Sequence, residues 1–388
     1  MIIEVFFIFL RLGLTSFGGP VAHLGYFRHE FVEKRKWLDS ETYSDLVALC
    51  QFLPGPSSSQ VGMAIGMMRA GVGGSIAAWL GFTLPSAVVL IVLGLGITQI
   101  DIGSYLGLIH GLKMVAAAVV AQAIWGMAKS HCSDFKRGII CVFSAIFVLL
   151  LPGSLEQITV ILISGVIGAF FLRSQVATNT KHIHVNIRKK TGLLFLALFG
   201  LLLIALPTVA DKTGIYGYEL FARFFQTGSL VFGGGHVVLP LLQSQVVPTG
   251  WVSNDTFLAG YGLTQAVPGP LFTFAAYLGA VSKESPSGWL GGLIAITAIF
   301  LPSFLMVIGI MPFWEQLRES KTTQRILIGV NAAVVGLLMA AFYNPIWVNT
   351  VFTIKDLIFV LFFYLILQIW KLPPWLVVII GALIGMTL

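Results

Sequence analysis

The chain has 388 residues, of which 57% are hydrophobic and only 10% are charged, and its mean hydropathy is +0.92. This composition excludes an ordinary soluble protein and indicates an all-α polytopic membrane protein. The formal net charge of +7 does not indicate nucleic acid binding, because membrane proteins gather basic residues in their cytoplasmic loops.

Apolar stretches of about 20 residues, the length that crosses a bilayer as a helix, recur along the whole chain. The first of them carries Glu4 where a signal peptide has basic residues, so we expect a retained span. The expected helices lie near residues 2–20, 75–97, 104–127, 138–152, 156–172, 192–209, 220–242, 288–311, 325–343, 355–370 and 373–388.

Two further apolar segments, 45–69 and 257–281, are each interrupted by Pro-Gly-Pro. Two prolines around a glycine remove backbone donors and force the chain out of a helix. A membrane core tolerates such a break only where protein or a watery cavity covers it. Both segments therefore predict a functional site rather than a plain span.

The second broken segment repeats the first. Residues 51–60 return as 265–274, and the Phe-Gly-Gly of 17–19 returns at 232–234. The matches fall on glycine and proline rather than on leucine and valine, so chance similarity between apolar stretches explains them poorly. We expect two homologous halves, residues 1–190 and 191–388.

The two halves differ in the charge of one loop. The loop at 27–44 carries four lysines and arginines, whereas its counterpart at 243–256 carries none. If positive charge marks the cytoplasm, the halves face opposite ways across the membrane. This predicts two repeats in inverted topology, a plan that secondary transporters use with a binding site near mid-membrane.

The same charge rule favours re-entrant hairpins for the two Pro-Gly-Pro segments, because every basic loop then lies in the cytoplasm. Segment 192–209 is apolar enough to cross the membrane, yet this arrangement places both of its ends on the same side. The expected number of crossings is therefore left between about 10 and 13.

A polar run, Ser57-Ser58-Ser59-Gln60, follows the first Pro-Gly-Pro directly. Proline is favoured in the first turn of a helix, so we expect a helix to restart here with its free N–H groups at the break. Such a terminus binds anions, and the hydroxyl groups add donors. The alternative is that the hydroxyls bond to the preceding turn or to neighbouring helices. The second copy offers only Thr273, which predicts a lopsided site.

The glycines at 18–19 and 233–235 either let helices pack closely or present bare N–H groups to an anion. His236, which follows them, either caps a packed helix or gives a proton or a hydrogen bond to the substrate. Arg11 and Arg69 lie in apolar segments, where a charge is costly and usually functional, so we expect them to be anion partners.

Several mechanisms are excluded by what the sequence lacks. It contains no phosphate-binding glycine loop followed by lysine, no His-Glu-x-x-His motif and no cluster of intramembrane carboxylates. ATP-driven transport, metalloproteolysis and a cation pathway are therefore not expected. The three cysteines match no paired metal or redox spacing. We expect no enzyme activity, no cofactor and no metal.

With these motifs in view, the chain resembles the chromate ion transporter family over nearly its whole length. This resemblance implies two homologous domains fused in one chain, and efflux of chromate from the cytoplasm across the bacterial inner membrane. The stretches that carry it are residues 12–20, 23–31, 46–60, 69–71, 81–86, 232–236, 238–240 and 267–279.

The candidate substrate-binding residues combine these motifs with the two arginines. The implied partners are chromate, sulfate as a competitor and membrane lipid, with a homodimer as an open alternative and no nucleic acid. A permease for sulfate or a related oxyanion, or an anion channel, is the alternative function, and a scaffold without transport is a third. The candidate residues are Arg11, Ser16, Gly18, Gly19, His23, Gln51, Gly55, Ser57, Ser58, Ser59, Gln60, Arg69, Gly233, Gly234, Gly235, His236, Gln265, Gly269 and Thr273.

Overall fold

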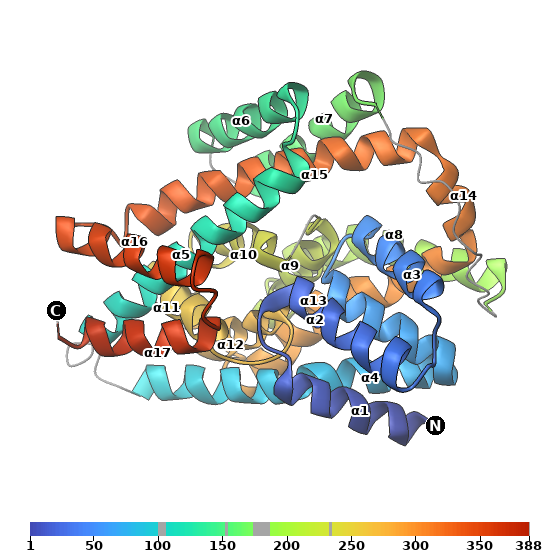
Figure 1. Ribbon diagram of the computed structural model, residues 1–388, viewed down its shortest axis with the longest axis horizontal. Helices are drawn as coiled ribbons and strands as arrows, with labels where there is room; N and C mark the ends of the chain where they lie inside the picture. The colour runs from blue at the N-terminus through green and yellow to red at the C-terminus, as the bar shows by residue number, and fades with distance from the viewer. Residues whose placement is uncertain (100–105, 152–153, 174–186, 233–234, 388) are drawn as a thin grey trace.

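The computed structural model describes residues 1–99, 106–151, 154–173, 187–232 and 235–387, and every regular element in them is helical (Figure 1). The first half contains α1 (Ile2–Thr15), α2 (Gly19–Arg28), α3 (Ser40–Phe52), α4 (Ser57–Gln99), α5 (Leu106–His131), α6 (Phe135–Leu150) and α7 (Ser154–Phe171). After α8 (Lys189–Thr213), the second half contains α9 (Tyr216–Leu230), α10 (Val238–Val246), α11 (Asn254–Thr264), α12 (Phe274–Val281), α13 (Gly288–Ile310), α14 (Trp314–Glu319), α15 (Lys321–Ala341), α16 (Ile354–Gln368) and α17 (Pro374–Gly385). The all-helical class is confirmed.

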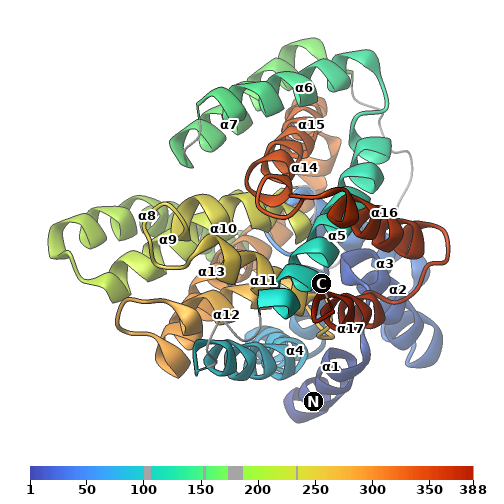
Figure 2. The same ribbon diagram turned by 90° about the vertical axis from the view of Figure 1, so that its left-hand side faces the viewer.

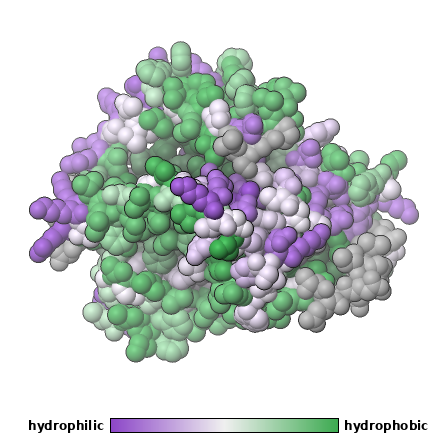
Figure 3. Space-filling model, turned by 180° about the vertical axis from the view of Figure 1, so that it is seen from behind, coloured by the Kyte–Doolittle hydropathy of each residue, from purple (hydrophilic) through white to green (hydrophobic). Residues whose placement is uncertain are grey.

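Five helical stretches in the described part of the chain are long and apolar enough to cross a membrane. They are Ser57–Ile97, Gly107–His131, Lys189–Thr213, Gly288–Phe313 and Lys321–Trp347. Apolar side chains cover much of the molecular face in Figure 3, as a surface in contact with lipid requires. The protein is therefore a multi-pass membrane protein. The expected helix at 192–209 is confirmed as part of α8, whose most apolar window is only 6% buried.

The helix α4 consists of two helices that run in opposite directions. Ala70 and Gly71 leave the helical conformation, Gly71 with a φ of +64°. Gly66 and Gly74 then lie so close that a Cβ on either would overlap the backbone of the other. In a straight helix these two positions would be about 12 Å apart, so the chain must reverse between them. In the second half, Gly279 of α12 and Gly291 of α13 make the same contact across the loop between their helices.

The predicted span at 2–20 is wrong, because α1 ends at Thr15 and the chain turns back into α2. Glu4 consequently lies 3.7 Å from Arg35 and 4.0 Å from Arg69 in ion pairs. A helix crossing the bilayer would separate Glu4 from Arg35 by about 30 Å. The turn is made by Gly18 and Gly19, whose φ angles of +101° and +77° are ones that residues with a side chain rarely adopt.

The predicted span at 220–242 is wrong for the same reason. The helix α9 ends at Leu230, and α10 begins only at Val238. The start of α9 is held near the loop that follows α10, because the ring of Tyr216 packs edge-on against Trp251 with centroids 4.7 Å apart. The helices α9 and α10 therefore form a hairpin that corresponds to the α1–α2 hairpin of the first half.

The two halves are interlocked. The helix α5 of the first half packs against α16 and α17 of the second, and α15 of the second half packs against α6 and α7 of the first (Figure 2). Glycines make these crossings close: Gly111 touches Gly381, and Gly168 touches Gly329. Because α5 and α15 occupy equivalent places in the repeat, the two contacts are equivalent. Each half thus completes the packing of the other.

Candidate functional site

In the centre of the molecule, each Pro-Gly-Pro turn meets the residue that precedes the Phe-Gly-Gly motif of the opposite half. The amide of Gly55 donates a 2.7 Å hydrogen bond to the carbonyl of Val231, and the amide of Gly269 donates a 3.0 Å bond to the carbonyl of Ser16. The two bonds are equivalent, since Ser16 and Val231 each precede the Phe-Gly-Gly of their half. Each bond joins one half to the other, so the centre exists only when both halves are folded together.

Glycine is required at both turns. Gly55 has a φ of +118° and Gly269 a φ of +107°, which residues with a side chain rarely adopt. A Cβ on Gly55 would come within 2.5 Å of Ser303 Oγ, and one on Gly269 within 2.7 Å of Ser86 Oγ. Ser303 and Ser86 again lie in the opposite half in each case. The repeated motif therefore encodes a contact between halves.

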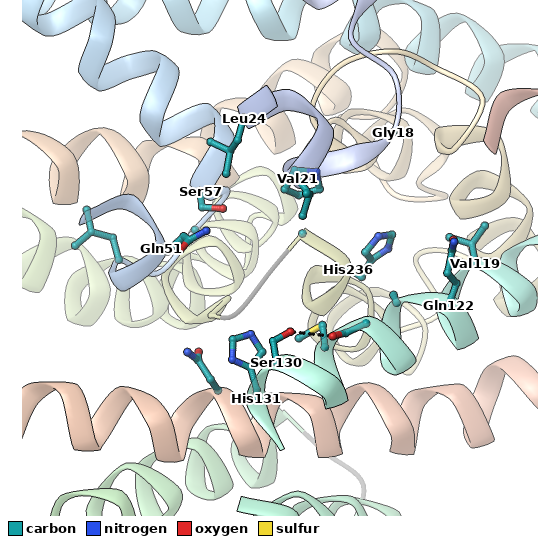
Figure 4. Close-up of a pocket in the computed structure, with 18 residues that line it drawn as sticks. Gly18, Val21, Leu24, Gln51, Ser57, Val119, Gln122, Ser130, His131 and His236 are labelled. Atoms are coloured by element: carbon teal, nitrogen blue, oxygen red, sulfur yellow. Dashed lines mark hydrogen bonds between the residues drawn. The ribbon is translucent and has the colours of Figure 1, made fainter. Parts of the chain in front are cut away.

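A cavity of about 630 Å³ lies beside this centre. Its walls come from the α1–α2 turn, the α3–α4 turn, the middle and end of α5, the turn before α10, and α15. In Figure 4, Gln122, Ser130 and His131 extend from α5 toward Val21, Leu24 and Ser57 on the other side. The lining residues are Gly18, Pro20, Val21, Leu24, Gln51, Leu53, Gly55, Ser57, Val119, Gln122, Ala123, Gly126, Met127, Ser130, His131, Gly235, His236 and Asn331.

The polar groups of this cavity are neutral side chains and two histidines. Gln51, Ser57, Gln122 and Asn331 supply amide and hydroxyl groups, and no lysine, arginine or carboxylate is among the described lining residues. Ser57 begins the helix after Pro56, so the free N–H groups and the positive end of that helix dipole lie at the cavity wall. The arrangement can donate hydrogen bonds to an anion without a fixed positive charge.

Several predicted residues line the cavity together. They are Gly18, Gln51, Gly55, Ser57, Gly235 and His236. His236 Nδ1 lies 2.7 Å from the hydroxyl of Tyr261, which fixes the orientation of the ring. The glycines Gly233 and Gly234 lie outside the described residues.

Other predicted residues of the first half are buried behind the cavity wall. His23 Nδ1 lies 3.3 Å from Ser58 Oγ, and Gln60 Nε2 donates a 2.6 Å bond to the carbonyl of Pro54. These bonds hold the Pro-Gly-Pro turn to the helices on either side of it, as the alternative interpretation of the polar run expected. Ser16 and Ser59 are also buried, and their hydroxyls have no partner among the described residues. Gly19 does not line the cavity either.

The predicted residues of the second copy lie outside the cavity lining. The hydroxyl of Thr273 donates a 2.7 Å bond to the carbonyl of Pro270, so it closes its own turn. Gln265 lies beside Tyr261, the partner of His236, and the amide of Gly269 donates a hydrogen bond to the carbonyl of Ser16. The cavity is therefore lined by the Pro-Gly-Pro turn of the first half and by Gly235 and His236 of the second.

Arg11 and Arg69 lie away from the cavity. Arg11 forms an ion pair with the buried carboxylate of Glu30, and Arg69 lies over the ring of Trp37, 4.6 Å from its centroid. Burial raises the pKa of Glu30, but the hydrogen bond from Arg35 and the charge of Arg11 outweigh this and hold the pKa below its usual value. Both arginines therefore hold helices of the first half together rather than face the cavity.

The part of the cavity wall that α5 and α15 contribute was not predicted from the sequence. Gln122, Gly126 and Ser130 follow one another at helical spacing on one face of α5, and Asn331 is an amide in the apolar middle of α15. Polar and small residues at a period of about four in an otherwise apolar helix were the available signal.

An all-helical membrane protein with interlocked repeats around a polar cavity has the architecture of a secondary transporter. The sequence also identifies the family. The chain belongs to the chromate transporter family, whose model matches residues 3–169 and 218–386. The family consists of transporters, so the protein is not an enzyme. One matched segment falls within each of the expected halves, and α8 lies between the two segments.

Named relatives agree with this assignment. The chain is 28% identical over 351 residues to a chromate transport protein of Pseudomonas aeruginosa, covering 87% of this chain and 79% of the relative. It is 26% identical to a probable chromate transport protein of Synechococcus elongatus, covering 97% and 93%. An uncharacterized transporter of Bacillus subtilis, YwrB, is 30% identical over 171 residues, which cover 43% of this chain and 85% of that protein. No solved structure matches the chain.

Proposed function

We propose that this protein is a secondary transporter that exports chromate from the cytoplasm across the bacterial inner membrane. One observation carries the proposal: a neutral polar cavity lies between the Pro-Gly-Pro turn of the first half and Gly235 and His236 of the second, and a helix N-terminus opens onto it at Ser57. The relatives named as chromate transport proteins support chromate as the substrate.

The cavity suits a tetrahedral oxyanion that keeps part of its hydration. Its volume of about 630 Å³ is much larger than one such ion, so water molecules can enter with it. We propose that the oxyanion accepts hydrogen bonds from the N–H groups at the start of α4, from Ser57, and from the amides of Gln51, Gln122 and Asn331. His131 and His236 add ring N–H donors. No cofactor or metal is needed for this step.

The membrane potential is a sufficient driving force for export. Moving a dianion outward across an inside-negative membrane of about 100 mV releases about 4.6 kcal/mol, which is twice the value of about 2.3 kcal/mol for one charge. This supports a gradient of about a thousandfold. Uniport or exchange for another anion therefore suffices, and proton coupling is not required.

We propose that the halves, 1–190 and 191–388, are inserted in opposite orientations. The equivalent cross-half bonds from Gly55 and Gly269, and the equivalent packing of α5 and α15, support a twofold relation between the halves. The basic loop at 27–44 and its counterpart without lysine or arginine support opposite sides of the membrane.

A role for α8 follows from the hairpins at the start of each half. If α1 and α2 enter and leave on the cytoplasmic side, and α3 and the first part of α4 do likewise, the first half has an even number of crossings: the second part of α4, α5, α6 and α7. The chain would then return to the cytoplasm before α8, and α8 must cross so that α9, the first helix of the second matched segment, starts outside. This gives fewer crossings than the expected range of about 10 to 13. It also leaves Lys129, Lys189 and Lys371 inside, as the charge rule requires.

In this topology the cavity opens to the cytoplasm. Its wall includes His131 at the end of α5 and Leu24 near the end of α2, both on the cytoplasmic side. At the opposite end of α5, Lys113 pairs with Asp255 at 2.9 Å and His110 lies 2.8 Å from Asp356. We propose that the structure represents the state that accepts substrate from the cytoplasm.

Chromate accumulation by whole cells tests the direction of transport. Cells that make the protein should accumulate less chromate than cells that make a Gly55→Ala variant at equal protein levels. Equal accumulation would count against export. Greater sulfate accumulation, with chromate unchanged, would favour the alternative, a sulfate permease.

A further inference from the structure

We propose that a second cavity, beside Lys371, is a loading site that gathers tetrahedral oxyanions from the cytoplasm before they enter the central cavity; this rests on the proposed function. The second cavity has a volume of about 470 Å³. It lies between the α1–α2 hairpin, the middle of α5, and the turn that joins α16 to α17. Its lining residues are Phe17, Gly18, Tyr26, Gln122, Leu367, Gln368, Lys371, Leu372, Pro373 and Pro374.

The second cavity adjoins the first. Gly18 and Gln122 line both of them. Gln122 Nε2 donates a 3.1 Å hydrogen bond to the carbonyl of Leu367. This bond connects α5 to the turn that carries Lys371. An ion that reaches Gln122 from the side of Lys371 has therefore reached the wall of the central cavity.

Lys371 is the single lysine or arginine that lines either cavity among the described residues. It is exposed, and within the described part of the chain no carboxylate forms an ion pair with it. Its backbone is left-handed, with a φ of +52°, so the ammonium group is carried on a sharp turn between two helices. Polar groups from Tyr26 and Gln368 lie in the same lining.

Electrostatics explains why the positive charge lies in the second cavity and not in the central one. A fixed positive charge inside the central cavity would hold a dianion tightly and slow its release, and the described lining of that cavity has none. A positive charge in the second cavity raises the local concentration of anions and their rate of entry without raising the affinity of the central cavity. Its effect must weaken as salt shortens the screening length, from about 30 Å at 0.01 M to about 8 Å at 0.15 M.

The test is initial-rate chromate uptake into inverted membrane vesicles, in which the cytoplasmic face is outside. In Lys371→Asn, asparagine keeps the left-handed turn and removes the charge. We expect the KM for chromate to rise about threefold to tenfold at low salt with the maximal rate retained, and the difference from wild type to shrink at about 0.15 M salt. Lys371→Arg should behave as wild type. Sulfate should compete at the same site, because the recognised feature is the tetrahedral dianion.

The matched control is Lys36→Asn. Lys36 is also an exposed lysine with a left-handed backbone, at a φ of +54°, and it lines neither cavity. The loading site is contradicted if Lys371→Asn leaves the KM unchanged, if it lowers only the maximal rate, or if Lys36→Asn raises the KM equally. The amount of folded protein, measured by size-exclusion chromatography in detergent, is matched between variants. If wild-type vesicles take up no chromate, the proposed function itself fails, which is a separate outcome.

Discussion

The amide of Gly55 and the carbonyl of Val231 are joined by a 2.7 Å hydrogen bond that crosses from the first half of the chain to the second. Its counterpart joins Gly269 to Ser16. The two bonds join equivalent residues of the two halves, which explains why the same Pro-Gly-Pro and Phe-Gly-Gly motifs occur twice. Each motif supplies one side of a contact whose other side lies in the opposite half.

Gly55→Ala should destabilise the protein and abolish transport. The new Cβ would meet Ser303 Oγ, and the φ of +118° would be strained for alanine. We expect a loss of about 1–3 kcal/mol of unfolding free energy. The measurement is the thermal unfolding midpoint in detergent together with vesicle uptake. Gly25→Ala is the control, because no atom lies within 4 Å of its Cβ position and its φ is not positive. An equal effect of the two changes would refute this role of the turn.

Ser57→Ala should weaken substrate binding and leave stability nearly unchanged. The hydroxyl lines the cavity at the start of α4, and its loss removes one hydrogen bond to the anion. The expected rise in KM is about threefold to tenfold, from about 1 kcal/mol for one hydrogen bond. Ser44→Ala is the control, since that exposed hydroxyl bonds only to the carbonyl of Ser40 among the described groups. An unchanged KM in Ser57→Ala would remove Ser57 from the binding site.

Asp255→Asn should lower stability, because it leaves the buried ammonium of Lys113 without its carboxylate. The Lys113 side chain is 8% exposed, whereas that of Asp255 is 63% exposed. Water can therefore reach the pair from one side, and we expect a loss of about 1–2 kcal/mol rather than the full cost of a buried charge. Thermal unfolding in detergent measures it, with Asp211→Asn on the exposed face of α8 as control. Equal unfolding midpoints for wild type and Asp255→Asn would show that the pair adds no stability.

Glu30 should make the protein less stable in acid. Its pKa in the folded state lies below the ordinary value of 4.5, because the bonds and charges of Arg35 and Arg11 outweigh the effect of burial. A depressed carboxyl pKa stabilises the fold above the unfolded-state pKa, and this stabilisation is lost as the pH falls through the folded-state value. Glu30→Gln should flatten the fall of the unfolding midpoint between about pH 6 and about pH 3. Glu33→Gln, at a largely exposed side chain, should retain the wild-type slope.

The topology predicts which positions share a side of the membrane. In a chain without its three native cysteines, single cysteines at Ile3 and Lys36 should react with an impermeant thiol reagent from the cytoplasmic side. A cysteine at Ser253 should react from the outer side. The pairing of Glu4 with Arg35 is the structural reason for the first expectation. Labelling of Ile3→Cys and Lys36→Cys from opposite sides would contradict the hairpin formed by α1 and α2.

The sequence predicted the turns of this fold better than it predicted its spans. Glycine and proline act on the backbone locally, so the breaks at Gly55 and Gly269 were evident from the sequence. The hairpin at Gly18 was missed, since the residues on both sides of it are apolar and an apolar window does not record a reversal of direction. The site was predicted in part for a similar reason. Arg11 seemed unpaired because its partner Glu30 is brought to it only by the fold, and Gln122 faces the cavity only because α5 crosses into the other half.

Potential-driven chromate uptake into inverted vesicles tests the central claim most directly. In vesicles energised so that the interior is positive, the wild type should show saturable uptake that rises with the potential and falls when an ionophore removes it. The folded Ser57→Ala variant should require more chromate for the same rate. Uptake that is independent of the potential, or equal in vesicles lacking the protein, would contradict electrogenic export through the cavity.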